Sequence, residues 1–368
     1  MILSVGGVPV TYGGKRLRLP MPRISVSGKN FIREEQVYNL WGWHSDVQTP
    51  LTDSGIVPLI QEEMRLLRRT KANVVRIFTQ MWDFVSGPDK DSLVFNSETF
   101  ANLKSLLDAA KDNNLYIKLC GANIWTPADA PEWFDALGHE DRWDVQATFY
   151  TLLVTAIMEC GHASTIFAYD LVGEPVVKTD PDYPWYGEES YPGVGGGVSG
   201  LYLNPCIARG PTATDQSARD FITQLSAAIK AVDPRALCTT GTLHFVGGAF
   251  GRDNTQDILD FVSPHIYPGT AEDIQGNTPP EQAQGWAAAT CPVVCGEFYA
   301  WSDDAPNRAL LDVITSDMQG VINWNGDELP WEIVIDPTLP IFDQILLAIQ
   351  RYNVELFLSV RNDFLDAA

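Results

Sequence analysis

The sequence predicts a closed (β/α)8 barrel, and three observations lead to this fold class. An amphipathic helical pattern, a short polar turn and an apolar β-branched run recur along the chain, most clearly at 55–78 and 97–120. Helices that alternate with strands buried on both faces are typical of a parallel sheet. Eight such strands close a sheet into a barrel. The eight apolar runs lie near 37–43, 74–79, 115–120, 166–172, 236–241, 260–266, 292–297 and 320–324.

Local signals support each unit, as the segment 97–120 illustrates. Apolar residues recur there at helical spacing from Phe100 onward, Ser97 is the expected N-cap, and Asn114 ends an Asn-Asn pair expected to turn the chain into the strand. The alternative fold is an open, doubly wound sheet. That fold favours a glycine-rich phosphate turn after an early strand, and neither GxGxxG nor GxxxxGK[ST] occurs in the chain.

Three further segments complete the predicted barrel, which we expect to be a single catalytic domain spanning 1–368. Residues 24–36 read as a β-hairpin turning across Ser27, Gly28 and Lys29 that closes the bottom of the barrel. Residues 340–353 read as the closing helix. The long segment 178–213 follows strand 4 and is rich in Pro, Gly, Tyr and Trp, so we expect it to border the substrate.

Composition excludes several classes of partner. The 368 residues include 25 lysines and arginines against 47 acidic residues, a formal net charge of −22 that disfavours nucleic acid and anionic lipid. No apolar run approaches the roughly 18 residues of a membrane span. The opening MILSVGGVPVTYGGKR does not resemble a signal peptide. We therefore expect a cytoplasmic protein, or a secreted one if a signal peptide has been removed.

The cysteines and histidines indicate neither a metal site nor a cofactor. The six cysteines do not form a disulfide framework or a CxxC motif, and the five histidines include no HxH or HExxH pattern. We expect no cofactor and no bound metal.

Two glutamates occupy matching places in the repeating unit. Glu174 ends the fourth strand and Glu297 ends the seventh, so both lie at the mouth of the barrel, where barrel enzymes build their active sites. Two carboxylates across a mouth lined by aromatic residues are what glycoside hydrolysis requires. Trp125, Trp301 and Trp324 follow strands 3, 7 and 8 and could stack on sugar rings.

Five motifs in order resemble clan GH-A glycoside hydrolases, and most closely glycoside hydrolase family 5, the cellulase family. They are ANVVRI, LVGEP, SPHIYP, VVCGEF and INWN, and they lie between the hairpin at 24 and the helix ending near 353. The resemblance implies the following roles: Arg76 beneath the nucleophile, Glu174 as acid/base, His265 and Tyr267 beside the glutamates, Glu297 as nucleophile and Trp324 under the sugar.

The chain departs from the family at two positions. Gly173 stands where the family has an asparagine that binds the sugar 2-hydroxyl, and Asn123 is a possible substitute; the histidine often found after strand 3 is missing from LCGANIW. Arg76 also has a purely structural alternative, a buried ion pair with Asp170.

The predicted function is a retaining β-glycosidase that acts by double displacement on a β-linked glycoside or oligosaccharide. A transglycosylase uses the same two glutamates and stays open. A second class of function is a carbohydrate-binding barrel with impaired catalysis, suggested by Gly173. A metal-dependent barrel hydrolase is disfavoured because the histidines do not cluster. The sequence leaves the sugar and the oligomeric state open.

Overall fold

A computed structural model describes most of the chain, including the whole set of predicted strands. The described residues are 4–5, 8–9, 11–12, 15–16, 20–45, 51, 54–123, 130–189, 202–267, 277–299, 305–324 and 355–366. The expected closing helix at 340–353 lies outside them. Among the helices of this described part, none is long and apolar enough to cross a membrane.

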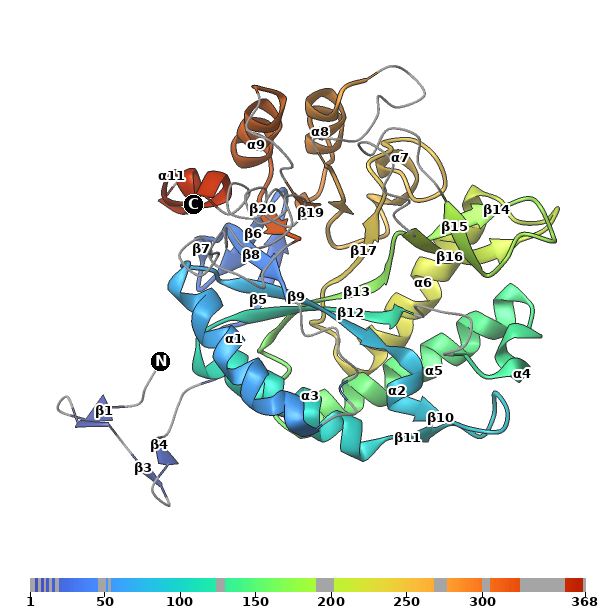
Figure 1. Cartoon of the computed structure of the whole chain (residues 1–368), viewed down its shortest axis with the longest axis horizontal. Helices are drawn as coiled ribbons and strands as arrows, with labels where there is room; N and C mark the ends of the chain where they lie inside the picture. Colours follow the sequence, from blue (N-terminus) through green and yellow to red (C-terminus); the bar gives the residue numbers. More distant parts are fainter. Residues whose placement is uncertain are drawn as a thin grey trace, which may run out of the picture.

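Eight parallel strands form the centre of the molecule, and each corresponds to one predicted run (Figure 1). They are β8 (Leu40–His44), β9 (Val74–Gln80), β12 (Tyr116–Asn123), β13 (Ile166–Gly173), β17 (Cys238–Thr242), β18 (Ser263–Pro264), β19 (Val294–Phe298) and β20 (Gly320–Asn323). Their order is β18-β17-β13-β12-β9-β8-β20-β19. Parallel bridges from Val262 to Val293 and from His265 to Glu297 join the two ends, so the sheet closes into the predicted (β/α)8 barrel.

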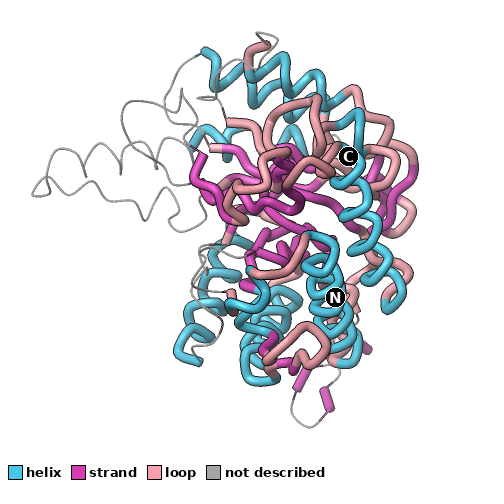
Figure 2. The backbone as a smooth tube through the Cα atoms, turned by 90° about the vertical axis from the view of Figure 1, so that its right-hand side faces the viewer, coloured by secondary structure: helices cyan, strands magenta, loops and turns pink. Residues whose placement is uncertain are grey.

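Helices lie around the strands (Figure 2), and the apolar side chains of the longer helices belong to the same buried core cluster as those of the strands. The longer ones are α1 (Val57–Arg69), α3 (Ser97–Asp112), α5 (His139–Glu159), α6 (Asp215–Val232), α8 (Pro279–Ala287) and α9 (Ala305–Asp317). Shorter elements are η1 (Ser54–Ile56), α2 (Met81–Phe84), α4 (Glu132–Asp135), α7 (Arg252–Thr255), α11 (Arg361–Asp366) and the strand pairs β1 (Ser4–Val5) with β2 (Val8–Pro9), β3 (Thr11–Tyr12) with β4 (Lys15–Arg16), and β10 (Val85–Ser86) with β11 (Val94–Phe95).

The helix α3 shows how local chemistry sets these units. Its N-cap is Asn96 rather than the expected Ser97, because the Asn96 side chain accepts hydrogen bonds from the backbone N–H groups of Glu98 and Thr99. The turn after the helix is as expected, with Asn114 in the left-handed region at φ 56°. The chain thus reverses directly into β12.

The N-terminal hairpin closes the bottom of the barrel, as predicted. It consists of β5 (Ile24–Ser27) and β6 (Asn30–Arg33), followed by β7 (Gln36–Val37). Phe31 is fully buried, and its ring lies 5.1 Å from the ring of Phe167 and 5.3 Å from that of Phe261. Burying such a side chain contributes about 1.5–3 kcal/mol. The bottom is therefore a packed apolar plug, and only the opposite end of the barrel is available for polar side chains.

The segment after β13 forms a three-stranded sheet in the order β14 (Val176–Lys178), β16 (Tyr202–Arg209) and β15 (Tyr186–Glu189). Trp185 and Tyr186 attach it to α4 and α5. The Trp185 indole N–H donates to the carbonyl of Asp135, and Arg142 donates to the Tyr186 hydroxyl. Trp185 and Tyr186 are 6% and 8% exposed, so they support the segment from within and leave little ring surface for a ligand.

Candidate active site

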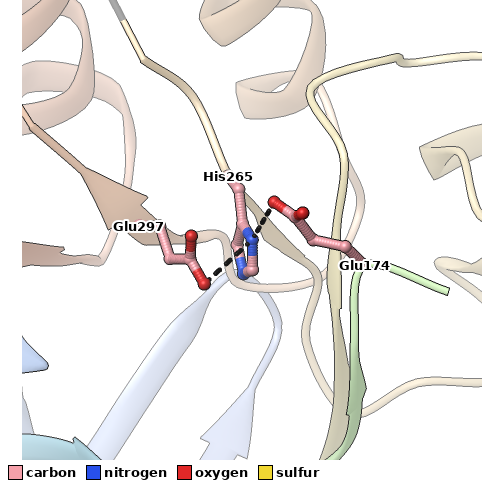
Figure 3. Close-up of side chains that lie close together, drawn as sticks. All are labelled: Glu174, His265 and Glu297. Atoms are coloured by element: carbon pink, nitrogen blue, oxygen red, sulfur yellow. Dashed lines mark hydrogen bonds and ion pairs between the residues drawn. The ribbon is translucent and has the colours of Figure 1, made fainter. Parts of the chain in front are cut away.

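The two glutamates converge on one histidine at the mouth of the barrel. His265 Nδ1 lies 2.8 Å from Glu174 Oε1 and 3.2 Å from Glu297 Oε1 (Figure 3). One oxygen of each carboxylate and this nitrogen lie within 4.8 Å of one another. Glu174 follows β13, Glu297 belongs to β19 and His265 bridges to β19, so closure of the barrel is what brings the three side chains together.

The backbone of Glu174 is held in an unusual conformation. Its φ is 50°, in the left-handed region that costs a non-glycine residue about 1–3 kcal/mol. The Glu174 N–H donates to the carbonyl of Gly241 at 2.7 Å, which fixes the turn against the neighbouring strand β17. Backbone strain of this kind clusters at functional sites, and here it accompanies a side chain that faces His265.

Arg76 forms ion pairs with both Glu297 and Asp170, which the sequence analysis gave as alternative partners. Its Nη1 lies 2.5 Å from Glu297 Oε1, and its Nε lies 3.0 Å from Asp170 Oδ2. The guanidinium is fully buried on β9, so these interactions are not weakened by solvent. Arg76 therefore positions Glu297 and is itself positioned by Asp170.

A second buried cation, Lys118, completes this network. Its Nζ lies 2.9 Å from Asp170 Oδ2 and donates to Ser263 Oγ at 2.7 Å. Lys118 and Asp170 are both 0% exposed. Burial lowers the pKa of Lys118, and the negative charge of Asp170 opposes this shift. Burial alone would raise the pKa of Asp170, but the positive charges of Lys118 and Arg76 bring it below its usual value. Two buried cations thus face two anions, which offsets the cost of removing four charges from water.

The environments of the two glutamates differ in the way that acid and nucleophile require. Burial and the negative charge of Glu297 together raise the pKa of Glu174 to about 8, although the positive charge of Arg76 opposes the rise. Burial also raises the pKa of Glu297, but Arg76 and a hydrogen bond from Tyr267 oppose the rise. The Tyr267 hydroxyl donates to Glu297 Oε2 at 2.5 Å, as expected. Glu297 therefore loses its proton first, and Glu174 keeps its proton at neutral pH.

The imidazole of His265 is neutral in this site. Burial, together with Arg76 and Lys118, lowers its pKa well below the ordinary value. It fits because Gly241 has no side chain: a Cβ there would lie 2.6 Å from His265 Nε2 and 3.1 Å from Arg76 Nη2. Gly241 is therefore a packing requirement of the site.

The structure describes the side chain of one of the four remaining predicted site residues, Trp324. Trp324 follows β20 at the mouth, half-buried, with its ring stacked on His44 at 4.4 Å and 14°. Asn123 ends β12, but its side chain lies outside the described part, as do Trp125 and Trp301. The predicted sugar contacts of all four residues stay predictions.

Sequence reasoning missed Lys118 and the stacking role of His44. A signal existed for the lysine: YIKLC places one charge inside an otherwise apolar strand. Register pairs Lys118 with Arg76 on the neighbouring strand, and side chains at paired positions share a face. For His44, nothing in the sequence distinguishes a residue stacked on Trp324 from an ordinary core histidine.

The Glu174, His265 and Glu297 group has the spacing of metal ligands. However, Arg76 Nη1 binds the same Glu297 oxygen that lies near His265, and Lys118 lies within the same buried network. Two buried positive charges oppose a cation at this point. The residues thus fit an acid–base pair better than a metal centre.

Comparisons with known proteins agree with the fold. No family model and no curated protein matches the sequence. Among solved structures, the β-mannanase of the blue mussel Mytilus edulis has a TM-score of 0.62 at 14% identity, covering 93% of this chain and 98% of that one. The β-1,4-mannanase of the sea hare Aplysia kurodai has a TM-score of 0.61 at 18% identity, covering 92% and 96%. The exo-β-1,4-mannosidase of an Opitutaceae bacterium has a TM-score of 0.59 at 16% identity, covering 93% and 63%. At identities this low, the structural matches establish the shared barrel fold and nothing further.

Proposed function

We propose that this protein is a retaining β-glycosidase in which Glu297 is the nucleophile and Glu174 the acid/base. The observation that carries the proposal is the unequal treatment of the two carboxylates. Arg76 and Tyr267 both bind Glu297, whereas burial raises the pKa of Glu174 to about 8. One group is suited to attack as an anion and the other to donate a proton.

The reaction proceeds by two displacements at the anomeric carbon. A Glu297 oxygen forms a bond to C1 while the C1–O bond to the leaving group breaks, and Glu174 transfers its proton to that oxygen. A water molecule then gives a proton to Glu174 as its oxygen bonds to C1, and the bond from C1 to Glu297 breaks. Retention suits carboxyl groups about 5–5.5 Å apart, and inversion about 6.5–9.5 Å. One oxygen of Glu174 and one of Glu297 lie within 4.8 Å of each other, which is compatible with retention and is too close for the separation of about 9 Å at the upper end of the inverting range.

β-Mannosides are the substrates to test first. The solved structures that share this fold at more than 90% coverage of the chain include enzymes named as acting on β-1,4-mannan or β-1,4-mannosides. The net charge of −22 is compatible with a neutral sugar and unfavourable for an anionic one.

A carbohydrate-binding barrel without catalysis is the second candidate, and Gly173 is the observation that favours it. No side chain at this position can bind the sugar 2-hydroxyl. The remaining machinery argues against this candidate, because a binding site has no need of a buried network that keeps one glutamate ionised and the other protonated. A transglycosylase differs only in the acceptor that replaces water.

Azide rescue tests both assignments with matched variants. In Glu297→Ala, hydrolysis of an aryl β-mannoside should stop, and azide should restore turnover to give the α-mannosyl azide in one displacement. In Glu174→Ala, azide should instead intercept the glycosyl-enzyme and give the β-mannosyl azide. The same azide anomer from both variants would refute the assigned roles.

Two controls separate the alternatives. Wild-type turnover in the presence of a chelator should match turnover without it, whereas loss of activity would favour a metal-dependent hydrolase. A mechanism-based inhibitor should label Glu297 covalently. Sugar binding with no labelling and no turnover of any β-glycoside would favour the carbohydrate-binding barrel.

A further inference from the structure

A cavity of about 330 Å³ lies next to the proposed acid/base, between the chain that follows β13 and the loop that follows β17. Most of its described lining is apolar, with side chains from Val176, Val177, Leu243, Phe245, Ala249 and Phe250. Its loop side is the run TLHFVGGAFG at 242–251, a pattern that the proposed reaction does not use.

The cavity begins directly beside Glu174. Pro175 lines it and is the next residue along the chain. Thr242 also lines it and follows Gly241, whose carbonyl accepts the Glu174 N–H at 2.7 Å. In the proposed reaction the leaving group departs from C1 on the face opposite Glu297, where Glu174 protonates its oxygen. The group attached to that oxygen therefore lies on the Glu174 side, and the cavity lining begins at Pro175, the residue that follows Glu174.

The lining suits an apolar group better than a second sugar. Among its described residues Lys178 is the one charged side chain, and its Nζ lies 4.8 Å from the ring centre of Tyr183. Thr242 adds one buried hydroxyl with no hydrogen-bond partner in the described part of the chain, so beside Lys178 the described lining offers a sugar one polar side chain of this kind. A sugar brings several hydroxyl groups, and each one buried without a partner is penalised. An alkyl or aryl group carries no such penalty and gains from burial.

We propose that this cavity is an aglycone site, and that the substrate is a β-glycoside whose leaving group is an apolar alkyl or aryl alcohol. The inference rests on the proposed function and adds the class of leaving group to it. The volume is adequate, because a cavity of about 150 Å³ is enough to bind benzene. At 330 Å³ the space accommodates a chain of several methylenes or a pair of fused rings.

A series of alkyl β-mannosides and β-glucosides tests the proposal, because their leaving alcohols differ in length more than in acidity. Each buried methylene should raise kcat/KM about threefold to fourfold, so butyl should exceed methyl by roughly 50-fold if three methylenes are buried. The butyl β-mannoside should also exceed β-1,4-mannobiose in kcat/KM. The Phe245→Ala variant should reduce the butyl-to-methyl ratio at least fivefold.

The matched control is Phe95→Ala. Phe95 is also a partly buried phenylalanine, but it packs against Phe84 and Phe100 beside α3. This variant should keep the wild-type butyl-to-methyl ratio. Turnover with equal kcat/KM for methyl and butyl glycosides, or with preference for the disaccharide, would overturn the aglycone site and leave the proposed function standing.

Binding decides the inference separately from turnover. The Glu297→Gln variant should bind butyl β-mannoside at least tenfold more tightly than methyl β-mannoside in calorimetry, with a negative heat-capacity change. Adding Ala249→Trp, which fills the cavity, should abolish the difference. Equal affinities in Glu297→Gln would overturn the proposal even if no glycoside were hydrolysed, whereas absent turnover with unequal affinities would count against the proposed function alone.

Discussion

Replacing Asp170 with asparagine is the sharpest test of the buried network. Asp170 accepts from Arg76 Nε at 3.0 Å and from the Gly241 N–H at 2.6 Å, and lies 2.9 Å from Lys118 Nζ. Asparagine offers one acceptor oxygen, and its amide donors would face a cation. Arg76 and Lys118 would then share Glu297 as their remaining anion in this network. Breaking a buried ion pair costs about 3–5 kcal/mol, so we expect the free energy of unfolding in urea to fall by about that amount at pH 7.

Asp257→Asn is the matched control, because Asp257 also forms two hydrogen bonds with an arginine, Arg219, but is 63% exposed. Loss of the Asp257–Arg219 ion pair should lower the free energy of unfolding by at most about 1 kcal/mol. The difference in the free energy of unfolding between wild type and Asp170→Asn should become smaller at alkaline pH. With its pKa depressed further in the folded state, Lys118 binds fewer protons there than when unfolded, so the variant gains stability as pH rises towards about 10. A loss equal to that of the control would refute the reasoning.

Three further outcomes follow from the site. Because burial raises the pKa of Glu174 to about 8 and the protonated form is the acid, kcat/KM should fall as pH rises through that value. In Glu174→Gln, this fall at alkaline pH should be absent when an activated aryl glycoside is the substrate. An unchanged alkaline fall in the variant would contradict the assignment. Tyr267→Phe removes a hydrogen bond to an ionised carboxylate worth about 1.5–3 kcal/mol, so kcat/KM should fall roughly 10- to 150-fold and the acidic limb should move to higher pH as the pKa of Glu297 rises. In Gly241→Ala the new Cβ would displace His265, which lies 2.6 Å away, so activity should fall at least about tenfold while the fold persists. The control Gly138→Ala, whose added Cβ meets nothing within 4 Å, should retain activity, and a similar loss in both variants would indicate a general folding defect.

The positions of the strands were predictable because their signal is local. Runs such as ANVVRI and YIKLC are mostly apolar over the length of one strand, with a single charged residue in each, and polar turns separate them from amphipathic helices. A cap is decided by one hydrogen bond, and sequence alone does not distinguish Asn96 from Ser97 as the acceptor. The helix α3 was therefore predicted correctly, but its N-cap was placed one residue too late, at Ser97 instead of Asn96.

The convergence of Glu174, Glu297, His265 and Tyr267 was also predictable, since strand ends in a closed parallel barrel share one rim. The roles of Trp185 and Tyr186 were not. The aromatic content of the segment 178–213, to which both belong, suggested a substrate surface, but the choice between surface and core depends on whether Arg142 and Asp135 lie within reach. Such contacts join residues tens of positions apart and leave no periodic pattern.

The sequence by itself determined the barrel, its hairpin plug and the identity of the two glutamates, because hydrophobic periodicity and position at a strand end are properties of short segments. The family resemblance suggested which glutamate is the acid, but only the tertiary structure supplies a physical cause for a difference in pKa between the two. That difference depends on Arg76 and Tyr267 reaching Glu297, on Lys118 and Asp170 supporting Arg76 from adjacent strands, and on the burial of all of them together. Electrostatic energies between buried groups are set by distances of a few ångströms, and only the closed barrel fixes those distances.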